Sequence, residues 1–345
     1  MGRRDVVALD VFEPVLGQYQ GRHSIAIKRV RDMTTPVFIV DAFTDEKFGG
    51  NPAAVCLSNK KLSDKQYQKI AVEFNLSETV YPLPLESGDF KNDSRFNLRW
   101  FTPKTEVPLC GHATLATAHV LFHHVENVHQ KIFFETLSGE VTVEKEAAGQ
   151  YKINFPLFDL KSVKVPGFEN TMMDKFEEMA DPSFTAEIVK KMKLDSKLRG
   201  AVYAPKPKIL VLVLDETLTR NEFGAIDHCA DEIHKSDPNG DYLEAVIVTM
   251  NPKNSVSQGF VDKDGNPFDY ASRYFGPWVG VPEDPATGSS HSYLAELWKN
   301  YINKEELYAY QHYPGRGAQF RIRPVGDRVE IVGKAVTMVE GRAHF

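Results

Sequence analysis

The sequence predicts an α+β fold in which two related halves each wrap a mixed β-sheet around one central helix. Short apolar segments typical of strands are numerous, whereas each half has only one strongly apolar helix. A loop with acid–base residues and a glycine opens a helix twice, at 109–119 and at 283–298. A similar motif precedes each copy, at 99–103 and at 273–277. These matches indicate an internal duplication whose two loop–helix corners face a shared cleft.

The bulk composition excludes several classes of protein. The 345 residues suit one large domain or two ordinary ones, and a formal net charge of −6 without a basic stripe gives no support for nucleic-acid binding. No apolar run approaches the length of a membrane span. The three cysteines, Cys56, Cys110 and Cys229, are scattered without a CxxC motif. This argues against a disulfide framework or a structural zinc site and favours a reducing compartment, so we expect a cytoplasmic protein.

We divide the chain into an N-terminal extension, residues 1–32, and two related domains, 33–138 and 139–345. The turn at 137–139 is the predicted hinge, and the C-terminal strand is allowed to return to the first domain. The extension lacks the apolar core of a secretory signal, and its acidic residues argue against a transit peptide. Because its patterning is weak, we expect it to be dispensable for folding.

In the first half, strand patterns surround one amphipathic helix. Ser63 or Asp64 could cap this helix, which runs to Phe74 with an apolar face that begins at Tyr67. The strands expected around it are 37–43, 53–57, a segment that begins within 75–81, 96–101, 131–134 and 140–144, with a turn at 48–52.

The second half is less clearly patterned at first, because 156–200 contains prolines and charges. We expect, in order, a helix at 186–192, a strand at 208–214, a helix at 222–234, a strand at 245–250, the second corner helix, and closing strands at 320–324 and 328–338. No GxGxxG motif follows a strand, so a nucleotide cofactor finds no support.

The first corner brings together Cys110, Gly111 and His112. Cys and His suit nucleophilic and proton-transfer chemistry near neutral pH, the glycine permits a turn, and the free N–H groups of a helix start attract anions. Cys110 could be a thiolate base or a small buried hydrophobe, and His112 a catalyst or a structural hydrogen-bonding group. Glu78, where a helix gives way to a strand, could be a general base in the cleft or a solvated loop residue.

The second corner offers Asp284 in the position that matches the first corner. It could take part in chemistry or only complement the helix dipole. Ser289, after Gly288, could bind a substrate carboxylate or cap the helix. No His, Asp or Glu cluster has metal-ligand spacing, so we expect no metal, and no GxSxG motif is present.

Several motifs then occur in a fixed order: Asp-Ala-Phe at 41–43 with Gly-Asn-Pro-Ala-Ala-Val at 50–55, Asn-Leu-Ser-Glu-Thr at 75–79, Arg-Trp-Phe-Thr-Pro at 99–103, Leu-Cys-Gly-His-Ala-Thr at 109–114, and Glu-Asp-Pro-Ala-Thr-Gly-Ser at 283–289. In this order they closely resemble the phenazine-biosynthesis-protein-like (PhzF-like) isomerase family. The resemblance runs from about residue 35 to about residue 341. It implies the diaminopimelate-epimerase-like fold, with the active site between two pseudo-symmetric domains.

The resemblance also implies a reaction and a set of roles. The family's phenazine enzyme shifts a proton on a dihydro-hydroxyanthranilate ring without a metal or an organic cofactor, so we expect a small carboxylate substrate, no cofactor and a homodimer. The family's motifs imply that Glu78 moves the proton and that His112 and Asp284 assist catalysis or bind. Ser289 and the helix N-termini would hold a carboxylate. The remaining residues expected to bind substrate are Asn51, Ser77, Cys110, Gly111 and Gly288.

Two departures from the family pattern leave alternatives open. Cys110 stands where the phenazine enzyme has no thiol but related epimerases have one, and Asp284 stands where the second epimerase cysteine would be. A two-thiol racemase is therefore disfavoured. Three functions remain: a cofactor-independent isomerase acting on a small carboxylic acid, an epimerase that depends on Cys110, and a binding protein without catalysis. The joint presence of Glu78, His112 and Asp284 favours the isomerase.

Overall fold

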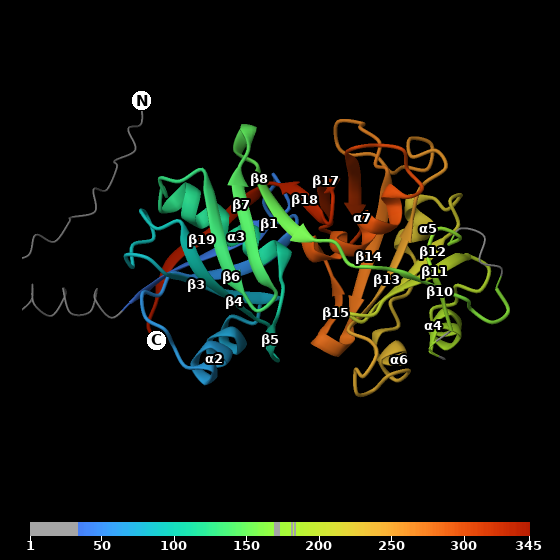
Figure 1. Ribbon diagram of the computed structural model, residues 1–345, viewed down its shortest axis with the longest axis horizontal. Helices are drawn as coiled ribbons and strands as arrows, with labels where there is room; N and C mark the ends of the chain where they lie inside the picture. Colours follow the sequence, from blue (N-terminus) through green and yellow to red (C-terminus); the bar gives the residue numbers. More distant parts are fainter. Residues whose placement is uncertain (1–33, 169–172, 181, 183) are drawn as a thin grey trace, which may run out of the picture.

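The computed structural model describes residues 34–168, 173–180, 182 and 184–345, and the predicted extension 1–32 lies outside the described residues. Two halves lie side by side along the long axis of the molecule, each a sheet curled around one helix (Figure 1). This confirms the predicted α+β class. Within the described residues, no helix is long and apolar enough to cross a membrane.

The first half curls around helix α3 (Gly111–His119), whose residues are all buried. A π-helical turn, Val120–His124, continues it. Helix α2 (Asp64–Phe74) begins at a capping box and packs on the outer face of the sheet. In spatial order the strands are β19 (Ala335–Ala343), β1 (Thr35–Ala42), β2 (Asn51–Cys56), β3 (Glu78–Pro84), β4 (Arg95–Phe101), β6 (Lys131–Thr136), β7 (Gly139–Lys145) and β8 (Tyr151–Pro156), with β5 (Glu106–Val107) paired to β4.

The second half curls around helix α7 (His291–Lys299), which a 3₁₀ turn at Gly288–Ser290 precedes. In spatial order its strands are β10 (Glu178–Met179), β9 (Lys161–Val163), β11 (Leu198–Ala204), β12 (Ile209–Leu214), β13 (Ala245–Met250), β14 (Tyr270–Gly276), β16 (Leu307–Gln311), β17 (Ala318–Val325) and β18 (Arg328–Gly333), with β15 (Val281–Asp284) paired to β14. Helices α4 (Thr185–Lys191), α5 (Arg220–Gly224) and α6 (Ala230–His234) complete it, with 3₁₀ turns at Ala147–Gly149 and Pro277–Val279 elsewhere in the chain.

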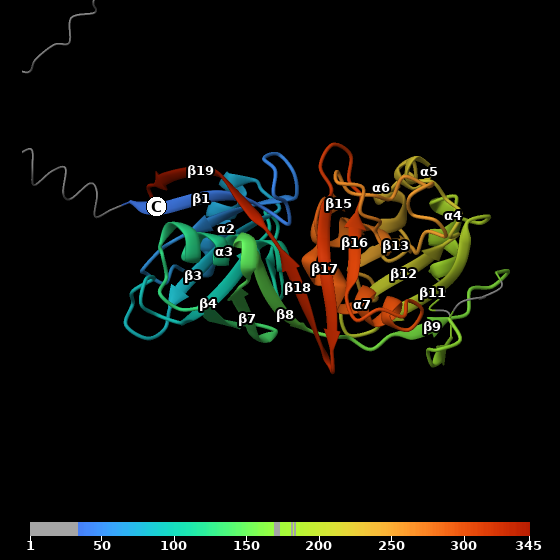
Figure 2. The same ribbon diagram turned by 90° about the horizontal axis from the view of Figure 1, so that it is seen from above.

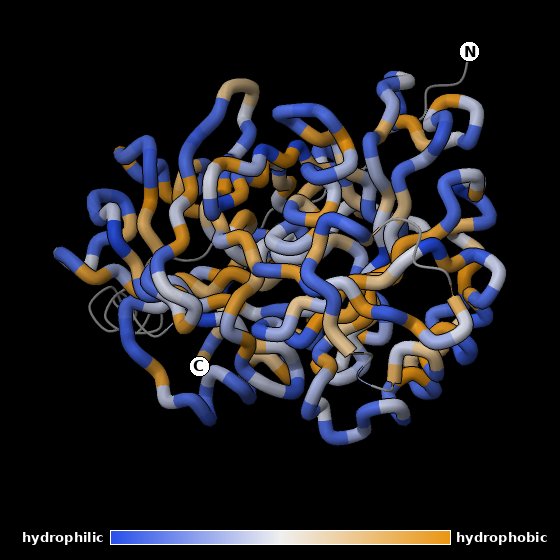
Figure 3. Tube along the Cα trace, turned by 45° about the vertical axis from the view of Figure 1, so that its right-hand side comes forward, coloured by the Kyte–Doolittle hydropathy of each residue, from blue (hydrophilic) through white to orange (hydrophobic). Residues whose placement is uncertain are grey.

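Strand β12 shows why the sequences of the central strands are continuously apolar. Val211 and Val213 face the cluster that contains α7, whereas Leu210 and Leu212 face the cluster that contains α4, α5 and α6. Because both faces of the strand are covered, every residue of β12 is buried and apolar. In the trace coloured by hydropathy, hydrophobic segments run through the interior of both halves, and many peripheral loops are hydrophilic (Figure 3).

The two halves repeat one order of strand pairings, which supports the predicted duplication. In the first half β1–β2 is antiparallel, β2–β3 parallel, β3–β4 antiparallel and β4–β6 parallel. Strands β11, β12, β13, β14 and β16 repeat this series. Equivalent ion pairs brace the equivalent strands, Arg99–Glu106 on β4 and β5 and Arg273–Glu283 on β14 and β15.

The sheets of the two halves are joined through β8 and β18, which pair antiparallel, and β17 and β18 run between the halves (Figure 2). The predicted hinge at 137–139 is therefore wrong. Leu137 and Ser138 form the turn of the β6–β7 hairpin, and the pairing of β7 with β6 and β8 keeps it in the first half. The chain leaves the first half after Pro156, and β19 returns to pair with β1.

Two predicted elements are each divided in the structure. The helix expected at 222–234 becomes α5 and α6, because the buried Arg273 side chain takes the carbonyls of Phe223, Gly224 and Ile226 that would continue the first helix. The strand expected at 328–338 divides into β18 and β19 at Lys334, where the chain changes partner from β17 and β8 to β1.

Candidate active site between the two halves

The two predicted corners meet directly at their glycines. A Cβ atom on Gly111 would lie 2.8 Å from the Cα atom of Gly288. A Cβ atom on Gly288 would lie 3.2 Å from the Cα atom of Gly111 and 2.7 Å from the ring of Phe43. Both positions therefore require glycine because the backbones of the two halves approach each other closely.

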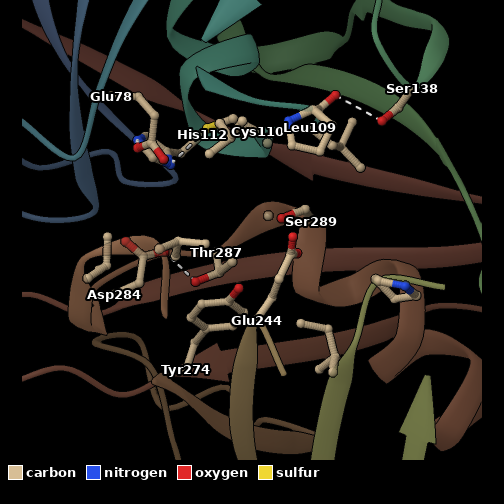
Figure 4. A pocket seen from close by; sticks show the side chains of 18 of the residues that line it. Glu78, Leu109, Cys110, His112, Ser138, Glu244, Tyr274, Asp284, Thr287 and Ser289 are labelled. Carbon is tan, nitrogen blue, oxygen red and sulfur yellow. Dashed lines mark hydrogen bonds and ion pairs between the residues drawn. The ribbon is translucent and has the colours of Figure 1, made fainter. Parts of the chain in front are cut away.

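A cavity of about 320 Å³ opens beside this contact, and both halves line it. Figure 4 shows Glu78, Cys110 and His112 on one wall and residues of the second half on the other. The polar or chemically active residues that line it are Glu78, Thr102, Cys110, His112, Ser138, Lys206, Glu244, Tyr274, Asp284, Thr287, Ser289 and Tyr293. The cavity is therefore the place where the predicted chemistry of both corners converges.

His112 is the centre of the first-half wall, with only 3% of its side chain exposed. Its Nε2 atom lies 2.9 Å from Oε2 of Glu78 and 3.2 Å from Oγ of Ser77. Its Nδ1 atom lies 3.2 Å from Nδ2 of Asn51 and 3.5 Å from Sγ of Cys110. The imidazole thus connects the carboxylate of Glu78 to polar groups on its opposite side.

The environment of Asn51 fixes which nitrogen of the neutral imidazole carries the proton. Nδ2 of Asn51 donates to Oδ1 of Asp284 at 2.7 Å and to the carbonyl of Ala286 at 3.2 Å, while its Oδ1 accepts from Ser77 at 2.8 Å. The amide hydrogens therefore also face Nδ1 of His112, which must accept. In the neutral imidazole Nε2 then carries the proton, on the side that faces Ser77 and Glu78.

Asp284 is held at the start of the second corner and is 7% exposed. Oδ1 accepts from Asn51 and Oδ2 accepts from the hydroxyl of Thr287. Gln311 braces the loop, donating to the carbonyl of Asp284 at 2.7 Å and accepting from the N–H of Thr287 at 2.7 Å. Burial, helped by the charge of Glu78, raises the pKa of Asp284 to about 6 against the opposing effects of His112, Thr287 and Asn51.

The electrostatics distinguish the thiol from the imidazole. Burial raises the pKa of the Cys110 thiol to about 11, and the neighbouring carboxylate of Glu78 also raises it. Burial opposes the charged form of His112, but Cys110 and Glu78 outweigh it and hold the pKa of the ring above its ordinary value. The raised pKa of Cys110 disfavours the thiolate that a base would need.

The structure separates the predicted binding residues into two groups. Cys110, Gly111, Gly288 and Ser289 line the cavity, as do Glu78, His112 and Asp284. Asn51 and Ser77 do not line it: Asn51 is fully buried, and both side chains contact His112 instead. Asn51 contacts both His112 and Asp284, and Ser77 contacts His112, so the two side chains support residues that do line the cavity, and the direct substrate contact expected of them stays a prediction.

Further cavity residues were not expected from the sequence. Glu244 precedes β13, Tyr274 is in the motif that precedes the second corner, and Thr287 and Tyr293 lie in and after that corner. The position of Glu244 directly before a buried strand could have indicated from the sequence that it lies at the cavity. Tyr293 had no such signal, because the apolar face of a buried helix predicts a core position.

Glu78, Cys110 and His112 bring their ligand atoms within 4.8 Å of one another and could in principle hold a metal ion. One ion can bond only one nitrogen of the imidazole, however, and the two partners lie at different nitrogens. The arrangement fits a hydrogen-bonded acid–base group better than a common metal ion.

Comparisons with known proteins place this geometry in a family. The family model described as phenazine biosynthesis-like protein (PhzC-PhzF) matches residues 40–341. A phenazine biosynthesis-like domain-containing protein of Bos taurus is 38% identical over 90% of this chain and 99% of its own length. An uncharacterized isomerase of Halalkalibacterium halodurans is 34% identical over 89% of this chain and 97% of its own.

Solved structures agree with this match. The crystal structure of a PhzF family phenazine biosynthesis protein from Enterococcus faecalis is similar with a TM-score of 0.70 and 30% identity, covering 91% of this chain and all of the other. More distant epimerases share the epimerase-like fold alone. On the extent of these matches, the chain belongs to the phenazine biosynthesis-like (PhzF) protein family.

Proposed function

We propose that the protein is a cofactor-independent isomerase that moves a proton on a small carboxylic acid, with Glu78 as the acid–base group. The observation that carries the proposal is the position of Glu78, whose side chain is 12% exposed, lines the cavity and pairs with His112 at 2.9 Å. A base must lie within hydrogen-bond reach of the proton it removes, and Glu78 is the carboxylate that borders the cavity on the first-half wall.

The chemistry follows from the neighbours of Glu78. The C–H bond of the substrate breaks as an O–H bond forms on Glu78. The carboxyl proton exchanges with solvent, and Glu78 then delivers a proton to another carbon. The Nε2–H group of His112 orients the carboxylate and compensates for its changing charge. Asp284, on the opposite wall, would bind or assist from the second half.

The two corners supply groups for the negative charge that develops on the substrate. Within the described chain, the N–H groups of Gly111, His112, Gly288 and Ser289 have no hydrogen-bond acceptor. A substrate carboxylate in the cavity beside the corners would accept from such groups, and they would stabilise the negative charge left on the substrate when the proton departs.

The experiment is proton exchange in deuterated buffer, followed by NMR with trans-2,3-dihydro-3-hydroxyanthranilate first and other small carboxylic acids next. The protein is dialysed against a chelator beforehand, and a matched sample receives divalent metal. We expect deuterium at a substrate carbon in both samples. Exchange that appears only after metal is added would contradict cofactor independence, and exchange on no acid of the panel would contradict the isomerase.

The second candidate, a Cys110-dependent epimerase, is favoured by the presence of a thiol on the cavity wall. The raised pKa of Cys110 argues against it. Inactivation by iodoacetamide that a Cys110→Ser variant escapes, together with loss of exchange in that variant, would favour the epimerase. A binding protein without catalysis would retain ligand affinity and show no exchange with any acid.

A further inference from the structure

We propose that Glu244, Tyr274 and Tyr293 form a subsite for the protonated amine of the ligand, so that the cavity selects amino acids over simple carboxylic acids. The inference deepens the proposed function and rests on it to the extent that substrate occupies the same cavity. Glu244 would be the residue that determines this specificity. These three residues are referred to below as the amine subsite.

The amine subsite lies on the second-half wall. Glu244 and Tyr274 are on the opposite side of the cavity from Glu78 and His112, and the side chain of Glu244 extends toward the gap beside Ser289 (Figure 4). Glu244 is the residue before β13, Tyr274 is in the neighbouring strand β14, and Tyr293 is in α7. Three elements of one half thus direct polar groups into a single part of the cavity.

These polar groups have no partners in the protein. Neither the carboxylate of Glu244 nor the hydroxyls of Tyr274 and Tyr293 make a hydrogen bond or ion pair with any residue that the structure describes. Tyr293 is only 4% exposed and Glu244 is half-buried. Because these groups line the cavity without a protein partner, they are free to accept from a donor group of a ligand that binds there.

The nearest lysines do not neutralise Glu244. Lys208 makes no ion pair with it and instead donates from Nζ to the carbonyl of Gly240 at 3.0 Å. Lys206 is exposed at the rim, where its ammonium lies over the ring of Phe158. Burial raises the pKa of Glu244 while Lys208 lowers it, as expected for a carboxylate that lacks a close counter-ion.

The charge of the whole cavity points to the same ligand. Three carboxyl groups line it, Glu78, Asp284 and Glu244, against one lysine at the rim and the imidazole of His112. A simple carboxylate bound at the corners would be repelled by Glu244 beside it. An ammonium group on the same ligand removes that repulsion.

The test is calorimetric binding of ligand pairs that differ only in an amine: 2-aminocyclohexanecarboxylate with cyclohexanecarboxylate, phenylalanine with 3-phenylpropionate, and alanine with propionate. For at least one pair, the wild-type protein should bind the amino acid about tenfold or more tightly, the usual scale of a charged hydrogen bond. In Glu244→Gln this preference should fall to about threefold or less, and Tyr293→Phe should reduce it in part.

Two control variants test whether the preference depends on Glu244 itself, rather than on net charge or on the acid–base residue. Glu305→Gln removes the same charge at an exposed position and should keep the preference, and Glu78→Gln should keep it while losing exchange. A wild-type protein without an amine preference in any pair, or a preference that survives in Glu244→Gln, would overturn the subsite. Because binding is measured without turnover, either result leaves the acid–base role of Glu78 to be judged separately.

Discussion

Replacement of Asp284 by Asn should stabilise the protein selectively above pH 6, and the structure gives the size of the effect. Burial raises the pKa of Asp284 from 3.8 to about 6. The folded state therefore binds this proton more tightly than the unfolded chain does. The resulting stabilisation is complete below pH 3.8 and is lost as the pH rises through about 6, so ionised Asp284 destabilises the fold at neutral pH.

The magnitude follows from the same two values. Since each tenfold change in proton affinity corresponds to about 1.4 kcal/mol, the full effect is roughly 3 kcal/mol, of which about 1.4 kcal/mol falls between about pH 5 and about pH 8. Because Asn cannot ionise, the stability of the Asp284→Asn variant should lack this pH-dependent contribution. Its oxygen can still accept from Asn51, and any cost of turning the hydroxyl of Thr287 is independent of pH.

The assay is urea unfolding of wild type and Asp284→Asn at about pH 5 and about pH 8. The difference in free energy of unfolding between the two proteins should move in favour of Asn by about 1.4 kcal/mol at the higher pH. The variant must be compared with wild type because the stability contribution of His119 increases with pH, which partly cancels the decrease caused by Asp284 in wild type alone. A difference that is the same at both pH values, or that moves the other way, would refute the reasoning.

Three further perturbations test other parts of the structure. Burial lowers the pKa of His119 to about 4, so stability should be lost as the pH falls from about 6.5 to about 4, and His119→Gln should show roughly 3 kcal/mol less of this loss in unfolding curves. Glu283→Gln should destabilise the protein by about 3–5 kcal/mol, because it leaves the buried guanidinium of Arg273 without its counter-ion. The equivalent Glu106→Gln removes a more exposed ion pair and should cost about 1 kcal/mol or less. Equal losses of stability in the two variants would contradict the burial argument. Gly111→Ala should cost about 1–3 kcal/mol by pushing the halves apart, and an unchanged urea midpoint would show that the contact yields without cost.

The sequence was most informative where one segment carries its own pattern. Helix α2 begins and ends where Ser63 and Phe74 predicted, since capping and a single apolar face are local properties. The strand at Ala245–Met250 matched for a similar reason, because a buried strand needs a continuous apolar run. The two corners were recognisable because glycine and acid–base residues are adjacent in each.

Long-range packing decided the features that were missed. The division of the helix at 222–234 depends on Arg273, a residue remote in sequence that takes the helix carbonyls. The hinge at 137–139 looked like a boundary because its residues are turn formers, yet strand pairing on both sides of β7 overrides that signal. The contact of Glu78 with His112, and the exclusion of Asn51 from the cavity, likewise arise only when distant segments meet.

The central claim is that Glu78 carries the proton. The measurement is loss of the carbon-bound proton signal by NMR in deuterated buffer, with dihydro-hydroxyanthranilate as the first candidate, for wild type, Glu78→Gln and Cys110→Ser. Glu78→Gln keeps the shape of the side chain but cannot accept a proton, so exchange should fall by roughly a hundredfold or more while folding and ligand binding are retained. Cys110→Ser should retain most of the exchange. Exchange that survives in Glu78→Gln and disappears in Cys110→Ser would contradict the account and assign the proton transfer to the thiol.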